Sequence, residues 1–152
     1  MATVRLDPAR VQAMITEQLM DTVDVGEVFE IGRAVTETDE PVVILEEIGL
    51  EYQPRNSEED VHCAALTVQV RCLVGSAQAS SLAIGGMVAN IVAGFENVSI
   101  THTASTHEVE VQNPSAVFGT VMAGDRAIRS ALIRVTGMAR RSTGSSTMSV
   151  VV

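Results

Sequence analysis

The stretch from Cys72 to Phe95, CLVGSAQASSLAIGGMVANIVAGF, contains no charged side chain. Its length is close to the ~20 apolar residues that a membrane-spanning helix needs. Polar and small residues interrupt the run, however, and it lacks the basic or aromatic flanks of a bilayer span. Its first three residues also continue an alternating strand, and Gly75 with Ser76 is typical of a turn. We therefore predict a helix that is buried in protein, after Ser76, and not a membrane span.

The two faces of this predicted helix differ. One face carries a large apolar stripe at helical spacing, suited to packing on a sheet: Ile84, Met87, Val88, Ile91, Val92 and Phe95. The opposite face repeats small or apolar residues at intervals of four, three and four: Leu82, Gly86, Ala89 and Ala93. Each glycine costs about 1 kcal/mol relative to alanine in an exposed helix. We expect this face to contact a second surface such as another subunit; the alternative is that solvent covers it.

The N-terminal part predicts a helix followed by strands. Asp7 can cap a helix that Pro8 begins, and apolar residues follow at helical spacing: Val11, Met14, Ile15 and Met20. A short strand or loop is expected near residues 27–35 and a strand near 42–51. The acidic segment 54–60, with Glu58, Glu59 and Asp60, is expected to project between strands.

The C-terminal part predicts three further strands. Alternation in ALTVQVRCLV places five residues on one face: Leu66, Val68, Val70, Cys72 and Val74. Segment 98–111 is typical of a hairpin that turns at 104–106, with His102 and His107 on its two arms. Residues 114–126 are expected to be a linking stretch, and a closing strand follows with Ala131, Ile133 and Val135 on one face.

This order predicts an α+β fold: a mainly antiparallel, mixed sheet with one long helix packed on it and an N-terminal helix. We expect residues 1–141 to form a single domain and residues 142–152 a flexible C-terminal arm. The arm ends in apolar residues that suit addition to a neighbour's sheet edge: Met148, Val150, Val151 and Val152. A disordered tail is the alternative.

Composition and charge favour association with other copies. The chain has no lysine, is 46% hydrophobic and has a net charge of −9. Residues 1–60 hold 15 acidic residues against four arginines, whereas residues 61–152 hold four against six. Such a surface can pair head to tail with itself through Arg126, Arg129 and Arg134; two solvated faces are the alternative. The acidic excess argues against tight binding to duplex nucleic acid.

The reactive residue types do not form a recognisable catalytic pattern. His62, His102 and His107 are not spaced as zinc ligands, and no phosphate-binding glycine-lysine motif occurs. Cys63 and Cys72 are nine residues apart, so on one strand they face opposite sides and are expected to stay reduced in a cytosolic setting. The N-terminal residues lack the apolar core of a signal peptide. We expect no metal, no cofactor and no enzymatic activity; a small cytosolic α+β enzyme or ligand-binding domain is the minor alternative.

The order of elements resembles that of the tail terminator, or tail completion, proteins of long-tailed bacteriophages. The resemblance rests on an alternating strand, CAALTVQVRCLV, a polar turn and an apolar helix, AQASSLAIGGMVANIVAGF. A hairpin and an arginine-rich closing strand, DRAIRSALIRVTGMARR, follow, and the N-terminal helix PARVQAMITEQLM fits the same layout. An aromatic residue often found near the start of the family's long strand is replaced here by His62 and Cys63.

The resemblance implies a hexameric ring in the virion, assembled in the host bacterial cytoplasm. Such a ring caps the tail tube and joins it to the head connector or head-closure protein. DNA would pass without specific binding through a lumen for which Glu58, Glu59 and Asp60 are candidate linings, because like-charged walls do not hold a polyanion. Another neck or tail protein, such as a head-closure or tail tube protein, remains the alternative, and no membrane partner is expected.

Overall fold

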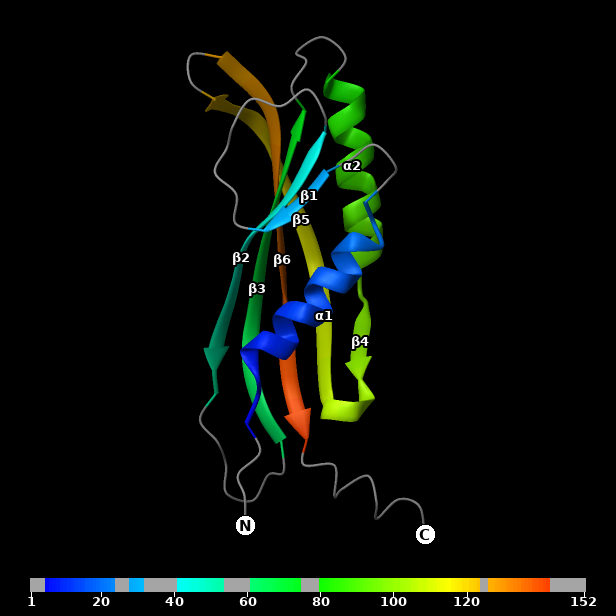
Figure 1. The fold of residues 1–152 in the computed structure, drawn as a ribbon, viewed down its shortest axis with the longest axis vertical. Helices are drawn as coiled ribbons and strands as arrows, with labels where there is room; N and C mark the ends of the chain where they lie inside the picture. Colours follow the sequence, from blue (N-terminus) through cyan, green and yellow to red (C-terminus); the bar gives the residue numbers. More distant parts are fainter. Residues whose placement is uncertain are drawn as a thin grey trace.

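The computed structural model describes residues 5–23, 28–31, 41–53, 61–74, 80–123 and 126–142. They form two α-helices, α1 (Pro8–Met20) and α2 (Ser80–Phe95), and a single-turn helix η1 (Thr103–Ser105). The strands are β1 (Val28–Ile31), β2 (Val42–Tyr52), β3 (Val61–Val74), β4 (Ser99–His102), β5 (His107–Ala123) and β6 (Arg126–Ser142). Figure 1 shows the long strands running the length of the molecule, with α1 crossing in front of them.

The strands form one sheet in the order β1-β2-β3-β6-β5-β4. Among the described strands, the β1–β2 pair is parallel and the other four pairs are antiparallel. The predicted α+β class with a mainly antiparallel, mixed sheet is therefore confirmed. The β3–β6 pairing extends from Val61 opposite Ser142 to Val74 opposite Arg129. This long pair forms the centre of the sheet.

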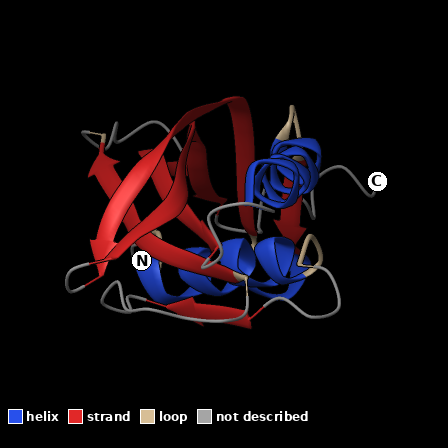
Figure 2. Ribbon diagram, turned by 90° about the horizontal axis from the view of Figure 1, so that it is seen from above, coloured by secondary structure: helices blue, strands red, loops and turns tan. Residues whose placement is uncertain are grey.

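Both helices pack on the same face of the sheet, and the core lies between them and the strands. Figure 2 shows α2 end-on, α1 from its side and a strongly curved sheet. Alternate residues of β3 and β6 are buried toward the helices, as the alternation predicts. The buried members are Leu66, Val68, Val70, Cys72 and Val74 on β3 and Ala131, Ile133, Val135 and Ala139 on β6.

Helix α1 begins as predicted but faces the core through a slightly different set of residues. The Asp7 side chain accepts a hydrogen bond from the Ala9 amide, and Pro8 starts the helix. Val11, Met14 and Ile15 are buried, whereas Met20 is 55% exposed and Leu19 is buried instead. The prediction of Met20 was wrong because the next position on the same helical face as Ile15 is i+4, which is Leu19.

Helix α2 buries its predicted stripe. Five of the six expected residues are buried, and Val92 packs partly buried against them. The helix spans 16 residues, against 13 for α1, so the expectation of one long helix is not confirmed. Neither α1 nor α2 is long and apolar enough to cross a bilayer.

The segment expected to link the hairpin to the closing strand is instead part of β5. Strand β5 continues from His107 to Ala123 and pairs with β6 along its whole length. A β-bulge between Gln112 and Ser115 interrupts the register, and Asn113 there has a φ of 47°. A bulge tolerates Pro114 and a left-handed asparagine within a strand. The prediction failed because Gly119 and Gly124 were interpreted as marks of a linking stretch.

A second, small apolar cluster lies on the sheet face opposite the helices. It consists of Val42, Ile44, Leu73 and Ile128, all 2% exposed or less, with Val121 packed against them. Strand β2 is therefore buried on both faces over residues 42–45.

Candidate assembly surface

The outer face of α2 is solvent-exposed and uncharged. Gly86, Ala89 and Ala93 are exposed, and a Cβ added at Gly86 would meet no atom within 4 Å. Leu82 belongs to the same helix, but its side chain lies outside the described part of the structure. The helix contains no acidic or basic residue. This face therefore offers a flat surface that another backbone could approach closely.

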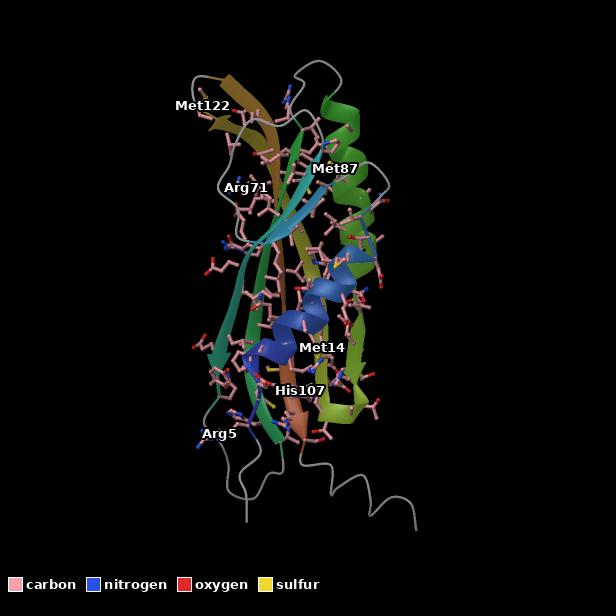
Figure 3. All side chains as sticks on the ribbon, viewed as in Figure 1. Arg5, Met14, Arg71, Met87, His107 and Met122 are labelled. Carbon is pink, nitrogen blue, oxygen red and sulfur yellow. The ribbon has the colours of Figure 1, made fainter. Side chains whose placement is uncertain are left out.

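Large apolar side chains gather where β5 and β6 extend together. We call residues 115–123 of β5 and 126–134 of β6 the hairpin end. Val117 is 69% exposed, Phe118 57% and Met122 61%. Figure 3 shows Met122 at the end of the molecule opposite His107. Isolated exposed apolar residues are common, but a group of three on one projecting element marks an interaction surface.

This exposed apolar group was not predicted from the sequence. Val117 and Phe118 are neighbours, and so are Val121 and Met122, so the segment does not alternate as a half-buried strand does. The available signal was the length of the apolar stretch SAVFGTVMA opposite AIRSALIRV. Such pairs of adjacent apolar residues place one side chain on each face of a strand.

A hollow of about 170 Å³ joins the hairpin end to α2. Ile84 lines it from the helix, Phe118 and Gly119 from β5, and Arg129 and Ser130 from β6. The hollow therefore lies between the hairpin end and the sheet-facing side of α2, to which Ile84 belongs.

The arginines of β6 divide into two groups. Arg129 and Arg134 are exposed, and neither forms an ion pair with another described residue; Arg126 begins β6, with its side chain outside the described part. Arg140, by contrast, lies 3.0 Å from Glu108 and also pairs with Glu110. The three predicted interface arginines thus belong to the hairpin end, whereas Arg140 is engaged within its own chain.

The opposite margin of the sheet is acidic. Strand β1 pairs only with residues 42–45 of β2, so no described strand lies beside residues 46–52. We call residues 46–52, EEIGLEY, the acidic edge. Glu47 and Glu51 are exposed, and Glu46 forms an ion pair with Arg71 of β3. Figure 1 shows this part of β2 at the outer margin of the sheet.

The remaining predicted site residues lie outside the described residues. These are Glu58, Glu59 and Asp60, the candidate lumen acids, and Met148, Val150, Val151 and Val152 of the arm. Strand β6 includes Ser142, the first residue assigned to the arm.

All three histidines lie in one row across the sheet. The register places His62 beside Arg141, Arg141 beside His107 and His107 beside His102. The opposition of His102 and His107 was predicted. The place of His62 in the same row was not, because it depends on the β3–β6 register, which spans 79 residues of sequence.

This histidine row anchors the segment that enters α1. The Leu6 amide donates to His62 Nδ1 at 2.8 Å, and the Asp7 amide donates to His107 Nε2 at 3.0 Å. Arg141 donates to the Arg5 carbonyl at 2.8 Å. We call His62, His107 and Arg141 the clasp, because their side chains satisfy the amides of Leu6 and Asp7 and the carbonyl of Arg5 just before the helix.

Chemically, His107 serves in this clasp as a hydrogen-bond acceptor through Nε2. His107 Nδ1 lies 3.0 Å from the Ser105 carbonyl oxygen, which can only accept, so we assign the ring proton to Nδ1. Burial, and then the Arg141 charge, lower the pKa of His107 below its usual value. Among the described residues, no group of three or more His, Cys, Asp or Glu side chains is arranged to hold a metal ion.

Cys63 and Cys72 both lie on β3, and their odd separation places them on opposite faces, as predicted. Cys72 is buried in the helix-side core and Cys63 is half-buried.

The chain matches no protein-family model, and no curated protein matches it in sequence.

Proposed function

We propose that this protein is a structural subunit that assembles with copies of itself into a ring, like the bacteriophage tail terminator proteins that it resembles. In this role the ring caps the tail tube and binds the head connector or head-closure protein. DNA passes through the ring without specific binding, and the protein is part of the virion neck.

The exposed apolar hairpin end is the observation that carries the proposal. Val117, Phe118 and Met122 are each more than half exposed in the single chain. Covering them in an oligomer removes apolar area from water at about 25 cal/mol per Å². The outer face of α2 is also free of charge and exposed at Gly86, Ala89 and Ala93, which supports the same conclusion.

The oligomeric state tests the proposal directly. We expect the purified chain to form a closed ring, measured as mass by light scattering and as rotational symmetry by negative-stain electron microscopy. Addition of tail tube protein should place the ring at the tube end and stop tube growth. Open-ended filaments would favour a tail tube protein instead. A chain that stays monomeric at high concentration, with and without tube protein, would refute the proposal.

A variant of the α2 outer face tests the assembly surface. Ala89→Arg introduces a large charge at an exposed position, so the monomer should fold while assembly is lost. Gln12→Arg, at an exposed position of α1, is the matched control and should assemble as the wild type does. Wild-type assembly of the Ala89→Arg variant would exclude this face from the interface.

A further inference from the structure

The hairpin end and the acidic edge have opposite charge. The hairpin end contains three arginines, Arg126, Arg129 and Arg134, and no acidic residue within its two ranges. The acidic edge contains three glutamates, Glu46, Glu47 and Glu51, and no basic residue. Opposite charges on two surfaces favour their encounter and fix their register.

Residues 115–123 of β5 and the acidic edge are also strand edges with no described strand beside them. Strand β4 pairs with β5 only as far as Glu110, and the Val111 amide makes one further bond to Val98. Residues 115–123 of β5 therefore have a described strand on the β6 side alone. The same holds for residues 46–52 of β2, which have β3 on one side and no described strand on the other. Unpaired edges present backbone donors and acceptors that another strand can satisfy.

The hairpin end has none of the features that normally protect an edge. Residues 115–123 contain no charge and no proline, and three of their side chains are large, apolar and exposed. Natural edge strands are usually blocked by lysine, proline or a bulge. Here the bulge and Pro114 come before this segment and leave it accessible.

We propose that the hairpin end of one copy docks on the acidic edge of a second copy, extending the sheet from one chain into the next. Two copies are required because β3 and β6 separate the two edges within a single chain. The contact joins two different surfaces. A row of copies therefore always has one free hairpin end at one of its ends and one free acidic edge at the other, until the row closes into a ring. This docking rests on the proposed function, because it requires that copies of the chain associate.

Strand direction and length agree with this docking. Strand β2 runs antiparallel to β3, β3 to β6 and β6 to β5, so β5 runs antiparallel to β2. If neighbouring copies keep the same orientation, the two edges therefore meet as an antiparallel pair. The acidic edge has seven residues and the β5 part of the hairpin end has nine, lengths that can pair almost completely.

Side-chain positions also agree. Glu47 and Arg134 both pair with Gln69 of β3, from its two sides, so they lie on the same face of the sheet. Arg134 is one strand away from the docking edge, and two strand spacings of about 4.8 Å separate it from a strand added beyond β5. The long arginine and glutamate side chains can span that distance.

A charge exchange tests the docking. One full-length variant carries Arg129→Glu and Arg134→Glu, and a second carries Glu47→Arg and Glu51→Arg. All four positions are exposed, and folding is checked by circular dichroism and urea unfolding. We expect each variant alone to lose assembly at concentrations where the wild type is assembled, because the two docking surfaces then carry net charge of the same sign. We expect an equimolar mixture to recover it as a complex that contains both variants in equal amounts.

The matched control reverses two exposed acids elsewhere, Glu17→Arg with Glu96→Arg, and changes the net charge as much as the second variant does. It should assemble normally; loss of its assembly would assign the effect to net charge and overturn the docking. A monomeric wild type would overturn both the docking and the proposed function. Wild-type assembly of the arginine variant, or a mixture that fails to recover assembly, would overturn the docking alone.

Discussion

Replacing His107 with glutamine is expected to reduce the loss of stability that the wild type shows between about pH 7.5 and pH 5.5, the range in which histidines titrate. His107 is 3% exposed, and its Nε2 accepts the Asp7 amide hydrogen at 3.0 Å. Its Nδ1 lies 3.0 Å from the Ser105 carbonyl oxygen and 2.8 Å from the Ser105 hydroxyl. A second proton, on Nε2, would point at the Asp7 N–H. Two donors would then face each other, and the hydrogen bond to Asp7 would be lost.

The sign follows from the direction of the pKa shift. Burial and the Arg141 charge lower the pKa of folded His107 below the usual histidine value of 6.5. Between these two pKa values the unfolded chain binds more protons than the folded chain. The free energy of unfolding therefore falls as the pH decreases from about 6.5, by at most about 1.4 kcal/mol per pH unit for one group. Above that range the contribution is fully present, and below the lowered pKa no further loss arises from this group.

Urea unfolding at about pH 7.5, 6.5 and 5.5 measures the effect, since this range lies above most carboxyl pKa values. His107→Gln removes the titrating ring and keeps a side-chain oxygen that can accept a hydrogen bond. His102→Gln, on the paired strand β4, is the comparison, and the reduction of the slope must be larger for His107→Gln. An unchanged slope in His107→Gln, or a wild type that is more stable at the acidic end, would refute the reasoning.

Three substitutions test the packing of the sheet and helices, each by urea unfolding at neutral pH. Gly137→Ala should cost about 2–3 kcal/mol, because its Cβ would collide with the Glu110 carbonyl oxygen and lie 3.0 Å from Val111 Cα; wild-type stability would show that β5 can move away freely. Gly85→Ala should stabilise the chain by up to about 1 kcal/mol, because no atom lies within 4 Å of the added Cβ and alanine favours the helix; a loss would indicate an undetected contact. Phe95→Ala should cost about 3–5 kcal/mol, because Phe95 is completely buried at the end of α2; a loss below about 1 kcal/mol would contradict its place in the core.

Local sequence patterns predicted the elements whose signals lie within a few residues. The cap at Asp7, the buried stripe of α2 and the alternation of β3 are all present in the structure. These succeed because a helix or half-buried strand repeats its apolar side chains at a fixed local period. The same reasoning placed Gly86 and Ala89 on the outer face of α2, where both are exposed.

Local pattern failed where both faces of a strand have similar surroundings. In residues 115–123, exposed apolar side chains lie on both faces of the strand and the sequence does not alternate, so the segment carries no periodic strand signal. The apolar hairpin end was consequently missed, although its arginines were identified. The register with β6 makes this segment a strand, and that register depends on pairing between chain segments.

The sequence by itself determined the α+β class, the helix faces and the division of charge between the two halves of the chain. Only the tertiary structure placed three histidines in one row and set the arginines of β6 and the glutamates of β2 on the two sides of β3. The reason is that helix and strand periods act over a few residues, whereas strand order and register arise from contacts between residues far apart in sequence.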